Sequence, residues 1–127
     1  MKVFLVSGFR IVEYNGKYYA KNQYAEIIKR YYNAFGQLDF CCRTESIDLI
    51  TSDYKDISEC VGITIYINSF IKSLLGIYNL RIQKIIKEYD LIIVRCPDIL
   101  AFQTAIVAKK EKKPYFVEVM GCTWDAL

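Results

Sequence analysis

The sequence alternates between short, mostly apolar runs and longer stretches in which apolar residues recur at every third or fourth position. Runs of strand length lie at 3–6, 91–94 and 115–119, and helical spacing is clearest at 22–35 and 69–89. Strands that alternate with helices predict parallel pairing, because each right-handed crossover returns the chain to the same end of the sheet. The pattern therefore predicts an α/β domain.

The segment between the first strand and the first helix is rich in turn signals. Ser7 and Gly8 are expected to close the strand, and the Asn15–Gly16 pair predicts a hairpin because both residues tolerate positive φ. Asn22 is the expected N-cap of the helix, and Gly36 stands where a C-terminal glycine is favoured.

The remaining elements are marked less evenly. A second strand is expected at 38–42, and Pro97 and Asp98 are expected to open a helix that runs through 110. Ser69 is the expected cap of the long helical stretch. Two further segments, "IDLIT" and "VGITIYI", are both strand-like, and we expect one of them to join the main sheet.

Together these elements predict a Rossmann-like, three-layer domain, with a mostly parallel sheet of about five to six strands and helices on both faces. Ligands of such sheets bind at the carboxyl ends of the strands, where the strand order reverses. The candidate site residues are therefore those that follow the first, fourth and fifth strands: Gly8, Phe9, Arg95 to Asp98, and Gly121 to Asp125.

Composition narrows the functional classes. The chain has 127 residues, enough for one domain with its own core, and a formal charge of only +3. Its basic residues are scattered, which argues against a nucleic-acid partner. Its five cysteines are an odd number without metal-ligand spacing, and the apolar start is too short for a secretory signal, so we expect reduced thiols and a cytoplasmic location.

Several catalytic motifs are missing from the sequence. There is no histidine, which excludes a Ser-His-Asp triad, a Cys-His dyad and histidine metal ligation within this chain. Neither a G-x-G-x-x-G nor a P-loop motif is present, so no cofactor is expected to bind here, and no D-x-D pair could hold a metal. We therefore predict no metal site, and the catalytic residues remain unknown.

Arg95 is the most informative single residue. It follows four consecutive apolar residues and stands at the predicted ligand edge, where a guanidinium could bind a phosphate or carboxylate. The alternative is a structural arginine that pairs with Asp98 or Glu118. Arg43, which follows the second strand, is a weaker candidate of the same kind.

Trp124 and Asp125, close after Gly121, form the second candidate group. A glycine lets the backbone approach a ligand, a tryptophan can stack on a sugar face, and an aspartate can accept hydrogen bonds from hydroxyls. The alternative is that Trp124 packs under a following helix and that Asp125 lies in the first turn of that helix, where carboxylates are favoured.

The stretch "DLIIVRCPDILAFQTAIVAKKEKKPYFVEVMGCTWDAL" resembles the N-terminal domain of GT-B-fold glycosyltransferases of the family 4 type. The motifs that carry the resemblance are "D-L-I-I-V-R-x-P", "K-P-Y" before a strand, and "G-x-x-W-D-A". "NGKYYAKNQYAEIIKRYYNAF" and "LDFCCRTE" are similar to the hairpin, first helix and second strand of that family. Only Arg95, Gly121 and Trp124 correspond by position, and we treat them as cleft-lining.

The resemblance implies that residues 1–127 are a single, incomplete N-terminal domain of a two-domain enzyme. This domain would hold a glycan or lipid-linked sugar acceptor, and a missing C-terminal domain would bind the nucleotide-sugar donor. The expected role is bacterial surface-polysaccharide synthesis at the inner face of the membrane. A face left open by truncation predicts a homodimer.

Two alternatives remain open. The first is a stand-alone flavodoxin-like interaction or regulatory domain without catalysis. The second is a membrane-surface adaptor that uses tyrosines beside basic residues, as in Lys29–Arg30–Tyr31–Tyr32, for a peripheral contact. Against the second, such tyrosines also suit a half-buried helix whose hydroxyls reach water.

Overall fold

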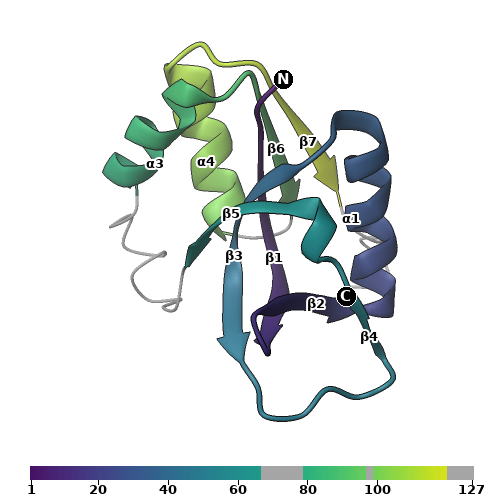
Figure 1. Ribbon diagram of the computed structural model, residues 1–127. Coiled ribbons are helices and arrows are strands. Elements are labelled where there is room, and N and C mark those ends of the chain that lie inside the picture. Colours follow the sequence, from purple (N-terminus) through teal and green to yellow (C-terminus); the bar gives the residue numbers. More distant parts are fainter. Residues whose placement is uncertain (67–78, 97–98, 120–127) are drawn as a thin grey trace.

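The computed structural model describes residues 1–66, 79–96 and 99–119. Within these ranges a seven-stranded sheet carries helices on both faces (Figure 1). The strands are β1 (Val3–Tyr14), β2 (Lys17–Lys21), β3 (Leu38–Ser46), β4 (Tyr54–Asp56), β5 (Val61–Tyr66), β6 (Leu91–Cys96) and β7 (Tyr115–Val119). The helices are α1 (Asn22–Phe35), α3 (Asn79–Ile85) and α4 (Ile99–Lys110), with 3₁₀ turns at Ser58–Cys60 and Ile86–Glu88.

Five of the strands run parallel, in the spatial order β5-β3-β1-β6-β7. The chain builds outward from β1 to β3 and β5, and then crosses back to add β6 and β7 on the other side of β1. This is the doubly wound order, in which the direction of building reverses between the first and fourth parallel strands. The predicted α/β, Rossmann-like architecture is confirmed, and the reversal lies between β1 and β6.

Strand β1 is three times as long as the predicted run at 3–6. The expectation that Ser7 and Gly8 end it is wrong. Between Val6 and Arg10 the register shifts, because four steps along β1 match two along β3, and the strand then continues. The predicted hairpin is confirmed: the turn residues Asn15 and Gly16 have φ of 50° and 76°, and the antiparallel strand β2 follows.

Helix α1 has the predicted amphipathic pattern. Ala25, Ile28 and Tyr31 are buried, and the neighbouring tyrosines pack against the same core. Asn22 is its first helical residue and does not cap it with a side-chain hydrogen bond, contrary to expectation. Gly36 ends the helix with a φ of 81°, a left-handed value that suits glycine, and its N–H donates to the Tyr32 carbonyl at 2.8 Å.

The middle of the chain resolves an ambiguity of the sequence. "VGITIYI" supplies β5, whereas "IDLIT" forms no strand and lies in the loop before β4. The short β4 was not predicted and pairs with β2. The expected helix cap Ser69 lies outside the described residues, as do Pro97 and Asp98, while the helix expected to end at 110 does so.

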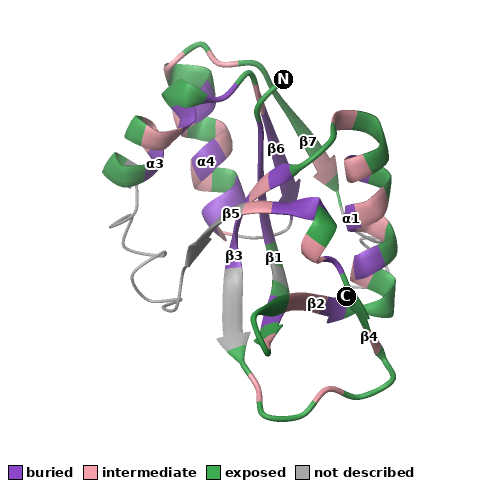
Figure 2. Cartoon of the chain, viewed as in Figure 1, coloured by how far each residue is buried: buried purple, intermediate pink, exposed green. Residues whose placement is uncertain are grey.

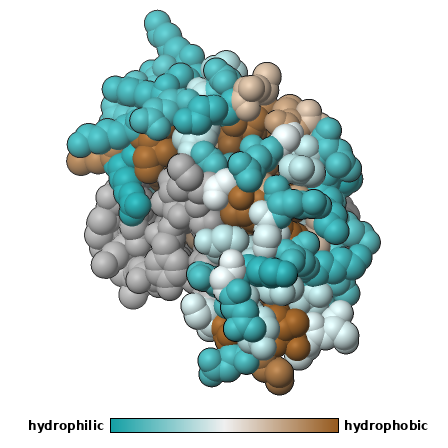
Figure 3. All heavy atoms as spheres, in the orientation of Figure 1, coloured by the Kyte–Doolittle hydropathy of each residue, from teal (hydrophilic) through white to brown (hydrophobic). Residues whose placement is uncertain are grey.

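The core consists of two clusters, one on each face of the sheet. One packs beneath α1 and the other beneath α3 and α4, so the central strands are buried on both faces (Figure 2). Among the described cysteines, Cys41, Cys42, Cys60 and Cys96 are buried free thiols. Apolar atoms also reach the surface at the lower end of the view, over the loop after β3, where Leu49 is exposed (Figure 3).

Candidate functional site

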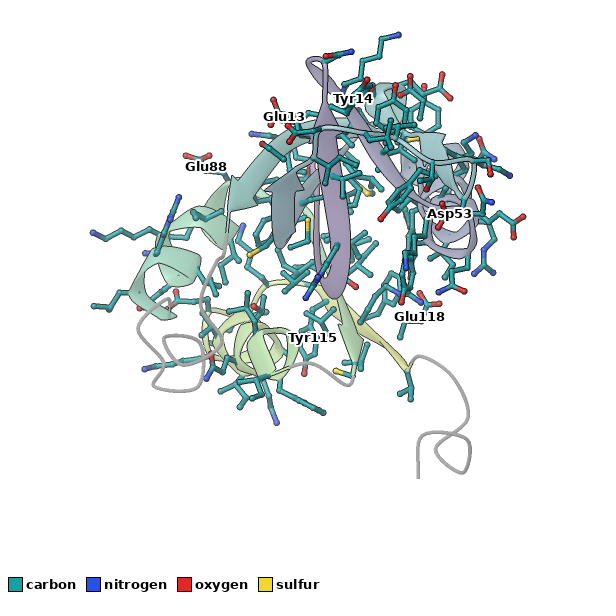
Figure 4. The ribbon with its side chains drawn as sticks, turned by 90° about the horizontal axis from the view of Figure 1, so that it is seen from below. Glu13, Tyr14, Asp53, Glu88, Tyr115 and Glu118 are labelled. Atoms are coloured by element: carbon teal, nitrogen blue, oxygen red, sulfur yellow. The ribbon has the colours of Figure 1, made fainter. Side chains whose placement is uncertain are left out.

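The neighbours of β1 change halfway along its length. On one edge β3 pairs with both halves of the strand. On the other edge β6 pairs with Val3–Val6, and β2 pairs with residues 12–14. Strand β2 therefore lies beyond the carboxyl end of β6, at the place where a doubly wound sheet binds its ligands. Figure 4 looks onto this carboxyl edge of the sheet.

A cavity of about 340 Å³ opens at this edge. Parts of four elements form its walls: the middle of β1, the end of β2, the first turn of α1 and the start of β4. Its lining residues are Gly8, Arg10, Val12, Lys21, Gln23, Tyr24 and Tyr54. The volume lies within the range of small-molecule sites, roughly 300–1,000 Å³.

The backbone explains why these side chains converge. Arg10 and Val12 are alternate residues of β1 after the register shift and therefore lie on one face of the strand, and Gly8 lies within the shifted stretch just before them. Lys21 pairs with Tyr54 across β2 and β4, which brings both residues to the same side of that antiparallel pair.

The start of α1 is held by the residue that precedes β4. The Asn22 N–H donates to the Asp53 carbonyl at 2.9 Å, and Tyr54, the next residue, begins β4. The Asp53 carboxylate accepts a hydrogen bond from the Thr51 hydroxyl, which is the main cause that lowers its pKa. Its own backbone N–H and the nearby Lys21 lower this pKa further, against a small opposing effect of desolvation. Figure 4 labels Asp53 beside the start of α1.

The cavity combines positive charge with aromatic surface. Arg10 and Lys21 line it, and none of the described residues at its wall carries a carboxylate. Tyr24 and Tyr54 are both partly buried, so each presents a ring and a hydroxyl at the wall. Gln23 adds an amide that can both donate and accept hydrogen bonds. This set can bind polar, ring-shaped molecules.

Arg95, predicted to line the cleft, is only 3% exposed and is not part of the cavity wall. Its Nε lies 3.6 Å from Glu118 Oε2, and Figure 4 shows Glu118 on the side of β7 that faces α1. Burial lowers the pKa of the guanidinium, the charge of Arg30 lowers it further, and Tyr24 opposes both. The structure thus shows the ion-pair alternative, with Glu118 as the partner.

The other predicted site residues are distributed unevenly. Gly8 lines the cavity, although it lies within β1 and not after its end. Phe9 and Arg43 have described backbones, but nothing is described of their side chains. Gly121, Trp124 and Asp125 lie outside the described residues, so their placement beside the cavity stays a prediction.

Sequence reasoning missed most of the cavity wall, namely Arg10, Val12, Lys21, Gln23, Tyr24 and Tyr54. A usable signal was present. Ile11, Val12 and Tyr14 are of residue types favoured in strands, and the hairpin predicted at Asn15 and Gly16 requires a strand before it, so a strand that carries Arg10 could have been expected.

In the described ranges, no group of three or more cysteine, aspartate or glutamate side chains is arranged to hold a metal ion. None of the helices in those ranges is both long enough and apolar enough to cross a membrane.

Among curated proteins, the chain is similar to Protein CapJ of Staphylococcus aureus. The two are 30% identical over 130 residues, which cover 99% of this chain and 33% of CapJ. The chain therefore spans about a third of the length of this relative. No protein-family model matches it.

Among solved structures, the fold is similar to the C-terminal domain of a hydrogenase from Pyrococcus furiosus. The TM-score is 0.53 at 16% identity, and the match covers 92% of this chain and 90% of that one. At this identity the likeness concerns the fold alone, and it agrees with the doubly wound arrangement described above.

Proposed function

We propose that the chain is the acceptor-side domain of a metal-independent glycosyltransferase in surface-polysaccharide synthesis, and that the cavity holds a glycan or lipid-linked sugar acceptor. The observation that carries this proposal is the cavity at the reversal point of the sheet, lined by two tyrosines, an amide and two cations. The similarity to CapJ along almost the whole chain supports the polysaccharide role.

The lining residues suit a saccharide. The partly buried rings of Tyr24 and Tyr54 offer apolar faces for the C–H side of a sugar, and their hydroxyls can bind its polar groups. Gln23, in the first turn of α1, and Lys21, at the end of β2, add hydrogen-bond donors. These residues would bind and orient the acceptor.

The chemistry of transfer would come from outside this chain. The chain has no histidine, and the described residues that line the cavity include no carboxylate that could accept a proton from the acceptor hydroxyl. The nucleotide-sugar donor and the catalytic residues would belong to a second domain of the intact enzyme. This division of roles is part of the proposal.

The test is isothermal titration calorimetry of the chain with acceptor-type saccharides and with UDP-glucose. We expect saccharide binding and no micromolar binding of UDP-glucose. Tyr54→Ala should weaken saccharide binding roughly five- to tenfold, because a stacking surface is lost. Tyr115→Ala is the matched control, since Tyr115 is a partly exposed tyrosine on β7, away from the cavity wall. Micromolar binding of UDP-glucose to this chain would contradict the proposal that a second domain binds the donor.

The stand-alone interaction domain is the second candidate, and the exposed apolar side chains of β7 favour it. Such a domain would bind neither saccharides nor UDP-glucose, so the same titration separates the two candidates. The peripheral membrane contact also stays a prediction. The tyrosines of α1 pack against the core, as a half-buried helix requires, and flotation with anionic vesicles would test for the contact directly.

A further inference from the structure

We propose that the outer face of α3 and α4 is a docking surface for an anionic lipid bilayer. The inference goes beyond the proposed function and does not use the cavity, whose walls include the first turn of α1 on the opposite side of the sheet. It also differs from the peripheral contact expected at the tyrosines and basic residues of α1.

Helices α3 and α4 lie side by side on one face of the sheet and pack over the same core cluster (Figure 1). Their carboxyl ends are tied to each other. Gln83 Nε2 donates to Glu111 Oε1 at 2.6 Å, and Lys113 Nζ donates to the Lys87 carbonyl at 2.9 Å. The residues at the ends of both helices are therefore presented at the same edge of the molecule.

The outer face of α4 carries apolar side chains first and lysines after them. Phe102 and Ile106 are 53% and 68% exposed, and Lys109 and Lys110 are exposed in the last turn. These four positions are spaced at i, i+4, i+7 and i+8, so they share one face of the helix. The buried residues of α4 lie on the opposite face, against the sheet.

Helix α3 and the turn after it repeat this pattern. Leu80 is 73% exposed, Lys84 follows it one turn later, and Arg81 and Lys87 are exposed beside them. Figure 3 shows hydrophilic side chains gathered over the upper left of the view, where α3 and α4 lie, with apolar atoms among them. The two helices thus form one surface in which exposed apolar side chains adjoin a basic rim.

The positive charge of this surface is not balanced by its own carboxylates. The segments 79–88 and 99–113 contain Glu88 and Glu111, and the Glu111 carboxylate already accepts a hydrogen bond from Gln83. None of the exposed cations of these segments forms an ion pair with a described carboxylate. There are six such cations: Arg81, Lys84, Lys87, Lys109, Lys110 and Lys112.

The side chains outside the description do not change the sign of this charge. They contain three carboxylates in all, Glu45, Asp98 and Asp125. Even with all three beside these helices, the carboxylates would be fewer than the six cations. The surface therefore attracts anions whatever the position of those residues.

The residue types distinguish between anionic partners. Lysine is depleted at protein–protein interfaces, and two copies of this surface would repel each other. A nucleic-acid duplex would match the charge and leave Leu80, Phe102 and Ile106 in water. An anionic bilayer suits both features, because apolar side chains enter the boundary of the acyl chains while lysines reach the headgroup phosphates.

The experiment is flotation of the chain with vesicles of phosphatidylcholine alone and with vesicles of equal parts phosphatidylcholine and phosphatidylglycerol. We expect binding to the anionic vesicles to be at least roughly tenfold tighter. The binding should weaken strongly between 0.1 M and 1 M salt, because the Debye length falls from about 10 Å to about 3 Å.

Charge variants locate the contact. A cation near an anionic bilayer contributes roughly fivefold to binding, so Lys109→Gln combined with Lys110→Gln should weaken it roughly 25-fold. Lys29→Gln combined with Arg30→Gln is the matched control, because it removes the same charge from α1. This control should bind nearly as well as the wild type. Circular dichroism of each variant checks that it folds.

An apolar variant separates bilayer insertion from simple charge attraction. Phe102→Ala should weaken binding roughly five- to tenfold, because less apolar surface enters the bilayer, and raised salt should not remove this difference. Leu49→Ala is the control, since Leu49 is an exposed apolar residue of the loop after β3. It should leave vesicle binding unchanged.

The outcomes that overturn the inference are distinct from those that test the cavity. Equal binding to both kinds of vesicle, or binding to neither, overturns it. A greater loss in the α1 control than in the α4 variant moves the contact to α1 and also overturns it. If Phe102→Ala binds normally and duplex DNA displaces the vesicles, the surface is a polyanion site and not a bilayer site. None of these results alters the saccharide titration, so the proposed function stands or falls separately.

Discussion

Strands β6 and β7 lie side by side and are built from similar residues, yet one is buried and the other is exposed. In β6 every residue from Ile92 to Cys96 is buried. In β7, Phe116 and Val117 are 38% and 47% exposed, and Val119 is 65% exposed. Figure 2 shows the contrast directly, because β6 is purple where β7 is green and pink.

The difference follows from position in the sheet. β6 pairs with β1 on one side and with β7 on the other, whereas β7 pairs only with β6 among the described strands. Apolar runs predict that both segments are strands, but they carry no information about which strand will be central. Pairing with distant strands decides which strand is buried. Truncating an apolar side chain should therefore lower the free energy of unfolding more in β6 than in β7.

The largest expected effect is in β6. Ile93→Ala should lower the free energy of unfolding by about 2–5 kcal/mol, because Ile93 is fully buried and its truncation leaves a cavity. Val117→Ala on β7 should change the same quantity by no more than about 0.5 kcal/mol. Urea unfolding followed by circular dichroism measures both. Similar losses in the two variants would show that β7 is covered in solution.

The ion pair between the two strands should have an intermediate effect. Glu118→Gln should lower the free energy of unfolding by about 1–2 kcal/mol, because Arg95 would keep its buried charge and lose its carboxylate partner. The loss is smaller than for a fully buried pair, since the Glu118 side chain is 32% exposed. Glu26→Gln on the exposed face of α1 is the control. No change relative to that control would mean that the pair contributes nothing to stability.

A smaller, pH-dependent effect on the free energy of unfolding is expected at Tyr89, which lies just before β6. The Tyr89 hydroxyl donates to Asp39 Oδ2 at 2.6 Å, and its ring stacks on Phe4. Burial first, and then Asp39, raise the pKa of Tyr89 well above its usual value. A raised pKa means that the stabilisation is complete below about pH 10, where tyrosine titrates in the unfolded chain, and is lost as the pH rises further.

Tyr89→Phe tests this directly. The variant should be less stable than the wild type near neutral pH, because the bond to Asp39 is missing, and the gap should narrow as the pH is raised through about 10 and above. Urea midpoints across this range provide the measurement. A gap that stays constant would show that ionisation of Tyr89 is not linked to folding.

The weakest effect on stability is expected at the exposed face of β7, where the predicted homodimer can be tested. The homodimer stays a prediction. If it uses this face, Val117→Thr with Val119→Thr should abolish association in light scattering and leave the monomer folded, because both side chains are exposed. A wild-type protein that stays monomeric at high concentration would contradict the predicted homodimer.

Much of the fold was predictable from local signals. The helical spacing of α1, the turn signal at Asn15 and Gly16, and the apolar runs of β6 and β7 all gave the right element. The continuation of β1 past Gly8 was predictable only in part. The hairpin signal implies a strand before Asn15, but the pairing of that strand with β3 is a long-range contact that a local pattern does not reveal.

The candidate site was less predictable than the fold, for the same reason. The rule for doubly wound sheets correctly pointed to the carboxyl edge and to Gly8. It could not distinguish a ligand-binding arginine from a structural one, because the partner of Arg95 lies on a neighbouring strand. Arg10 and Tyr54 reach the cavity through the hairpin and β4, and neither element follows from the general fold.

The shared strand β1 has a consequence for how the cavity would respond to its occupant. Its first half is held between β3 and β6 in the core, and its second half forms a wall of the cavity. The backbone of this wall is already ordered by its pairing in the core. A bound molecule would therefore cost little conformational entropy of the protein on that side. Substitutions deep in the core could therefore alter recognition without touching the ligand.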